Sequence, residues 1–115
     1  MKADLKSLWS ENCLLESYQP IEHDNFSFWV ELSIGSCGEE GADYFRLHIC
    51  TPEWLCKHHW LPELMRHTLL VRKYDLDEIK KIITDYIDQC EGNDWMEIAQ
   101  KLSRVFAWEY EDYQP

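Results

Sequence analysis

The chain has 115 residues, with 22 acidic side chains against 11 basic ones and a formal net charge of −11. A strong negative field repels nucleic acid and anionic lipid and attracts cationic partners, so the composition argues against a nucleic-acid binder. Acidity that only keeps a protein soluble is the plain alternative. Six Trp, six Tyr and four Phe are too many for an acidic disordered tail. We therefore expect one folded domain over residues 1–115.

The cysteines and the N-terminal residues indicate the cellular compartment. Five cysteines are irregularly spaced, and the N-terminal residues contain no apolar stretch of signal-peptide length. No segment approaches the ~20 apolar residues that a membrane span needs. These features predict a cytoplasmic protein with reduced thiols and no contact with a membrane, and they leave its oligomeric state open.

Alternation of apolar and polar residues with a period of two predicts the strands. Residues 2–9 are expected to form an N-terminal strand, followed by a polar loop over residues 10–24. The next alternating run places five apolar side chains on one face of the predicted strand: Phe26, Phe28, Val30, Leu32 and Ile34. A glycine-rich window at 35–41 precedes a second such run: Phe45, Leu47 and Ile49. Two alternating runs around a glycine-rich turn predict an antiparallel hairpin with one buried face.

A short helix and a short strand are expected next. Thr51 is placed to cap a helix over residues 53–58, with Pro52 at the first helical position. Residues 69–74 are expected to add a third core strand, shorter than the other two.

From Asp75 the apolar period changes to three and four residues, which indicates amphipathic helices. Asp75 starts the first helix and Gly92 is placed to end it, while Asp94 starts the second. The predicted fold is therefore α+β: an antiparallel sheet of three to four strands, followed by a C-terminal antiparallel helix pair packed on one face.

Histidines and cysteines gather in the middle of the chain and supply an alternative function. His48, Cys50, Cys56 and His58 are residue types that bind zinc, although no Cys-x-x-Cys pair is present. A small metal- or thiol-dependent enzyme would use this cluster. No motif demands a catalytic residue, a metal or a cofactor, so we expect none.

Aromatic residues with acidic neighbours form the main candidate site. Interfaces combine buried aromatic anchors with a polar rim, and carboxylates suit a basic partner. Such residues occur on the outward side of the predicted hairpin, in its loop and near the C-terminus. The candidate binding residues are Trp29, Glu31, Glu39, Glu40, Asp43, Tyr44, Glu109, Glu111 and Asp112.

Several stretches together carry a resemblance to a known family. They are Asn25 to Gly35, Gly41-x-Asp43-x-Phe45, Cys50-Thr51-Pro52-x-Trp54-Leu55, Cys90-Glu-Gly-x-x-Trp95 and Trp108-Glu109. Over nearly the whole chain, this pattern resembles the immunity protein 8 family of bacterial polymorphic-toxin systems. The resemblance implies a non-catalytic cytoplasmic α+β protein, encoded beside a secreted toxin that it neutralises in its own cell. Toxins of such systems, including those of contact-dependent growth inhibition, are often basic nucleases.

Charge and resemblance lead to one hypothesis. A toxin that acts on RNA or DNA presents cations to phosphates, and an antitoxin can cover that surface with carboxylates. We expect a protein that is not an enzyme and that neutralises the basic C-terminal nuclease domain of its cognate toxin by stoichiometric association. An acidic adaptor without a toxin partner is a third possibility.

Overall fold

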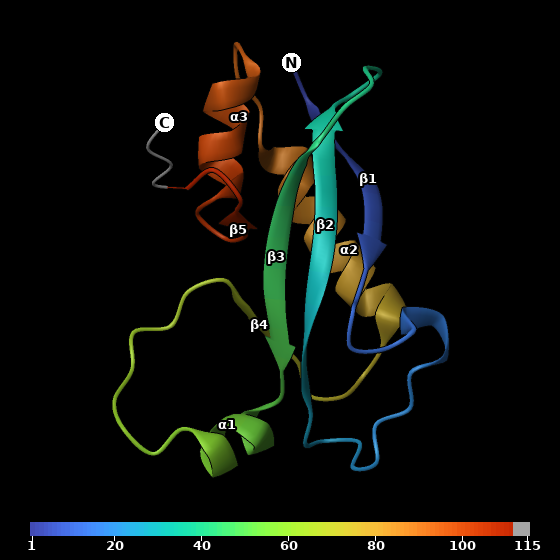
Figure 1. The fold of residues 1–115 in the computed structure, drawn as a ribbon, viewed down its shortest axis with the longest axis vertical. Coiled ribbons are helices and arrows are strands. Elements are labelled where there is room, and N and C mark those ends of the chain that lie inside the picture. Colours follow the sequence, from blue (N-terminus) through green and yellow to red (C-terminus); the bar gives the residue numbers. More distant parts are fainter. Residues whose placement is uncertain (112–115) are drawn as a thin grey trace.

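The computed structural model describes residues 1–111, which form a five-stranded sheet and three α-helices. Strands β1, β2 and β3 lie side by side in that order, and β4 and β5 both pair with β3 (Figure 1). The strands are β1 (Ala3–Trp9), β2 (Ser27–Ser36), β3 (Asp43–Cys50), β4 (Thr68–Leu70) and β5 (Ala107–Trp108). The helices are α1 (Pro52–His58), α2 (Leu76–Gln89) and α3 (Trp95–Leu102), with a 3₁₀ turn at Leu15–Ser17. The predicted α+β fold, with its C-terminal helix pair, is confirmed.

The β2–β3 hairpin forms the centre of the sheet in the register that its alternation predicts. Phe28 lies opposite Ile49 and Leu32 opposite Phe45, so the apolar residues of both strands share one face. Gly35 allows the two strands to approach closely, because a Cβ there would lie 2.2 Å from the carbonyl oxygen of Gly41. The predicted antiparallel hairpin is therefore confirmed.

The N-terminal strand lies where the sequence predicts it, with a bulge that changes which side chains face outward. The pairing of β1 with β2 shifts between Leu5 and Ser7. A bulge changes the alternation of side chains, so Leu5 and Leu8 both pack against the core. Trp9 consequently lies opposite Glu31 and faces away from the core.

Two short strands share the free edge of β3. β5 runs antiparallel to the start of β3, whereas β4 runs parallel to its end. The strand predicted over residues 69–74 is therefore shorter than expected, and its parallel direction departs from the antiparallel pattern. β5 is missing from the sequence-based prediction. Strands of two or three residues are too short to show an alternation, so only long-range pairing defines them.

All three helices begin at the predicted caps. The side chains of Thr51, Asp75 and Asp94 each accept a hydrogen bond from a backbone N–H of the first helical turn. The prediction that Gly92 ends α2 is wrong. The helix ends at Gln89 and the next residue, Cys90, is extended. A Cβ on Gly92 would lie 3.0 Å from the Glu97 side chain. Gly92 therefore provides room for close packing and no left-handed cap.

The apolar stripes of α2 and α3 pack against the same face of the sheet. Figure 1 shows α2 crossing behind β1 and β2, and α3 beside the upper half of β3. Their buried side chains join those of the hairpin in one core: Ile79, Ile83, Ile87, Ile98, Ala99 and Leu102. Neither helix covers the opposite face of the sheet. Within residues 1–111, no helix is long and apolar enough to cross a membrane.

One carboxylate joins three elements at the start of β3. Asp43 Oδ2 accepts a hydrogen bond from the indole N–H of Trp95 on α3, at 2.8 Å. It accepts a second from the indole N–H of Trp108 on β5, at 3.0 Å. An indole N–H removed from water needs an acceptor, so this bifurcated contact fixes α3 and β5 to the hairpin.

Replacing Asp43 by Ala leaves both indole N–H groups without this acceptor. We expect the free energy of unfolding to fall by about 3 kcal/mol, because hydrogen bonds to a charged group contribute about 1.5–3 kcal/mol each and partial exposure reduces the sum. Urea unfolding measures the change. Glu40→Ala, which changes an exposed carboxylate in the turn just before β3, is the matched control and should change stability by less than about 0.5 kcal/mol. Equal stability of the two variants would contradict the structural role of Asp43.

Candidate functional site

The face of the sheet opposite α2 and α3 presents a mixed aromatic and charged surface, which we call the outer face. The register of β1, β2 and β3 places eight side chains on it: Ser7, Trp9, Trp29, Glu31, Ser33, Tyr44, Arg46 and His48. An aromatic-rich sheet face that α2 and α3 leave uncovered is a surface available for a protein partner.

The upper part of the outer face carries its most exposed aromatic pair. Tyr44 is 54% exposed and Trp9 is 38% exposed. Their rings meet edge to face, with centroids 6.3 Å apart. Glu109 fixes the backbone beneath them, because the Tyr44 N–H donates to Glu109 Oε1 at 3.0 Å. In return, the Glu109 N–H donates to the Tyr44 carbonyl oxygen at 3.0 Å. The pair is therefore presented on a well-ordered strand, as a binding anchor requires.

The middle of the outer face is internally neutralised. Arg46 Nε donates to Glu31 Oε1 at 3.0 Å, and the Arg46 guanidinium carbon lies 4.6 Å from the centroid of the Trp29 ring. Trp29 also stacks on His48, with centroids 4.9 Å apart. Trp29 and Glu31 are thus brought together as the sequence predicts, but both already have partners within the chain.

The lower part of the outer face borders a cleft of about 740 Å³. One wall comes from the sheet and α1, and the other from the loop of residues 59–67, which stands away from the body of the protein (Figure 1). The lining side chains include Trp29, His48, Trp54, His59, Glu63, Leu64, Met65 and Arg66. Polar side chains are about as frequent in this lining as aromatic and apolar ones, so the cleft offers a partner both kinds of contact.

His48 is the most enclosed of the histidines that line this cleft. It is 9% exposed and contacts the rings of Trp29 and Trp54. Burial lowers the pKa of His48 from its ordinary value, and the nearby His59 lowers it further. The neutral form of His48 is therefore the one that the folded protein favours.

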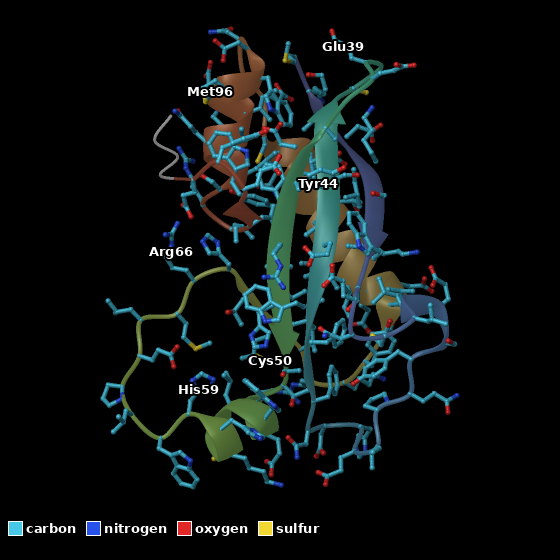
Figure 2. All side chains as sticks on the ribbon, viewed as in Figure 1. Glu39, Tyr44, Cys50, His59, Arg66 and Met96 are labelled. Atoms are coloured by element: carbon cyan, nitrogen blue, oxygen red, sulfur yellow. The ribbon has the colours of Figure 1, made fainter. Side chains whose placement is uncertain are left out.

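The predicted acidic residues fall into two groups. Glu39 and Glu40 are exposed at the tip of the β2–β3 hairpin, at the opposite end of the molecule from His59 (Figure 2). The other predicted binding carboxylates within residues 1–111 have hydrogen-bond partners within the chain: Glu31, Asp43, Glu109 and Glu111. Glu111 pairs with Arg66 at 2.7 Å. Asp112 lies outside the described residues. The tip therefore carries the predicted carboxylates that are most available to a partner.

Two surface features were missing from the sequence-based prediction. Trp9 reaches the outer face only because of the bulge in β1. The 59–67 loop exposes several apolar side chains that follow neither a helical nor a strand period, so periodicity gave no signal. A dense apolar stretch around Pro62, between polar neighbours, is the signal that could have identified it.

The histidine and cysteine cluster does not assemble into a metal site. Cys50 is fully buried, and burial raises the pKa of its thiol. His58 Nδ1 lies 2.9 Å from the Trp54 carbonyl oxygen. Cys56 is exposed, because α1 buries none of its side chains. Within residues 1–111, no three His, Cys, Asp or Glu side chains are grouped to hold a metal ion.

Comparison with protein families gives one match. The family model described as Immunity protein 8 matches residues 3–113, which is nearly the whole chain. No curated protein and no solved structure matches the chain.

The lowered pKa of His48 predicts a pH dependence of stability. Below the ordinary histidine pKa of 6.5, His48 binds a proton more readily in the unfolded chain than in the folded chain. Stability is therefore lost as the pH falls through that value and is regained as it rises. His48→Phe keeps a ring in the stack but does not titrate. We expect the free energy of unfolding of this variant to fall less than that of the wild type between about pH 7 and pH 5. Urea unfolding at several pH values tests this, and identical slopes would contradict it.

Proposed function

This chain belongs to the immunity protein 8 family, and from that premise we propose that it binds and neutralises a cognate secreted bacterial toxin by stoichiometric association. Family membership implies an immunity function and a toxin partner. The proposal adds that binding itself is the mechanism, that the protein acts in the cytoplasm, and that it performs no catalysis. The toxin would belong to a polymorphic system such as contact-dependent growth inhibition.

The observation that carries this proposal is the outer face. A sheet with helices on one side has a second face that must be solvated or bound. Here that face presents the Trp9–Tyr44 pair, and Tyr44 is 54% exposed. Aromatic side chains of this kind dominate the energy of protein interfaces. We place the centre of the toxin interface at these two residues, with Trp29 and Glu31 below them.

Charge supports a basic toxin domain. The chain has a formal net charge of −11, and Glu39 and Glu40 extend from the tip of the hairpin. Complementary fields accelerate association, and a Debye length of ~8 Å at physiological salt limits their range. A nuclease must offer cations to phosphates, so we propose that the partner is the C-terminal nuclease domain of the toxin. Asp43, Glu109 and Glu111 would then shape the interface more than they steer the partner, and Asp112 stays a prediction.

Titration of the toxin tests the proposed function. We expect the C-terminal domain encoded beside this gene to co-purify with the chain and to lose its activity on tRNA, rRNA or DNA at a 1:1 molar ratio. Cleavage assays with increasing amounts of the chain give the stoichiometry. Full cleavage at a molar excess of the chain would contradict the proposal, as would turnover of a substrate by the chain alone.

Removing charge at the hairpin tip tests the proposed electrostatic attraction between the chain and the toxin. Glu39→Gln with Glu40→Gln should reduce the association rate several-fold at low salt and flatten its salt dependence, because surface charges mainly steer the encounter. The dissociation rate should change little. Asp77→Asn with Asp88→Asn removes two exposed charges from α2, which packs on the other face. Stopped-flow kinetics measure the association rate of each double variant. An equal reduction for both would show that the net charge, and not its position at the hairpin tip, sets the association rate.

A further inference from the structure

The 59–67 loop exposes an apolar patch that the core does not use. Leu64 is 100% exposed, Trp60 is 83%, Leu61 is 81% and Met65 is 43%. Single exposed apolar residues are ordinary, whereas a contiguous group of several hundred Å² marks an interaction site. Four such side chains lie within six residues of one loop, which is a higher density than scattered single exposures give.

Contacts near both ends of the loop constrain its conformation. At its start, His59 Nδ1 contacts a carboxylate oxygen of Glu63. At its end, Arg66 pairs with Glu111. The backbone of His67, which has a φ of 58°, accepts a hydrogen bond from the His48 N–H at 2.8 Å. The apolar side chains between these anchors are therefore displayed by a defined backbone, which reduces the entropy lost on binding.

Most charges around the patch have partners within the chain. Lys57 contacts Glu53 at 3.3 Å and Arg66 pairs with Glu111, while His59, which is charged only when protonated, contacts Glu63. A surface whose charges are mostly paired has little electrostatic preference. Its affinity for a partner must come from the burial of apolar area.

The patch is continuous with the outer face. Leu64 and Met65 line the same cleft as Trp29 and His48, so one partner could contact both regions. The hairpin tip with Glu39 lies at the other end of this surface (Figure 2). A loop alone is smaller than the ~800 Å² per partner of a standard interface, but the loop and outer face together can supply such an area.

The net charge of the whole chain disfavours a second copy as the occupant of this patch. A second copy of the chain would bring another net charge of −11, and like charges oppose association. A basic partner suffers no such repulsion.

We propose, on the basis of the proposed function, that the 59–67 loop is a docking element for an apolar patch on the cognate toxin. Trp60, Leu61 and Leu64 are its anchors. The loop governs dissociation of the complex, whereas the acidic tip governs association. Binding therefore combines two regions with different physical roles at opposite ends of the outer face.

Matched leucine and isoleucine variants test the loop. Leu61→Ser with Leu64→Ser removes two exposed anchors, and Leu14→Ser with Ile21→Ser removes two apolar side chains that are 76% and 103% exposed in another loop. We expect the first pair to raise the Kd for the toxin C-terminal domain at least ~10-fold, mostly through faster dissociation at any salt concentration, and the second pair to leave it unchanged. Trp60→Ala should raise the Kd at least ~30-fold.

The outcomes separate the two proposals. Because these side chains are exposed, all variants should keep the wild-type melting temperature. If the wild type inhibits the toxin domain while the loop variants bind it with unchanged Kd, the role of the loop is refuted and the proposed function stands. If the wild type does not bind the toxin domain, both proposals fail. Sedimentation equilibrium of the free chain should give a monomer. A dimer that Leu61→Ser with Leu64→Ser dissociates would assign the patch to self-association and refute the docking proposal.

Discussion

Burial of one face of the β2–β3 hairpin against α2 and α3 is the constraint on which the other features depend. Alternation along β2 and β3 assigns every second side chain to the core, so the intervening residues are placed on the outer face. Residues such as Trp29 and Tyr44 therefore occupy fixed positions on a rigid scaffold. Asp43 adds to this rigidity because it holds α3 and β5 on the same hairpin. A binding surface built in this way loses little entropy when a partner arrives.

The net charge alone gives a misleading picture of the surface. Glu31, Glu109 and Glu111 are acidic, yet each accepts a hydrogen bond from a group within the chain. Their role is largely to orient neighbouring side chains and backbone. Glu39 and Glu40 are different because the hairpin tip carries them into solvent. The long-range field of the protein belongs to all its carboxylates, whereas these two are the predicted binding carboxylates that are most available for local contact.

A surface that combines a charged hairpin tip with an apolar loop would suit a protein that must bind its partner quickly and remain bound. Charge raises the rate of encounter but is screened by salt. Apolar contacts have short range and slow the separation of the complex. The two kinds of group are found at opposite ends of the outer face, with the Trp9–Tyr44 pair between them. Because the two kinds of group are separate, a substitution can change the association rate without changing the dissociation rate, or the reverse.

Local periodicity and capping residues encode the β2–β3 hairpin, the three helix starts and the α+β class, so these features could be predicted from the sequence. The neighbouring positions of Trp29 and Glu31 could be predicted too, since they are two residues apart on one strand. The other features depend on contacts between distant segments. The two-residue strand β5 exists only through its pairing with β3, and Trp9 faces outward only because β1 bulges against β2. Whether a carboxylate is paired or available, and whether the apolar 59–67 loop packs or stays exposed, depends on contacts between residues distant in the chain, which local patterns do not record.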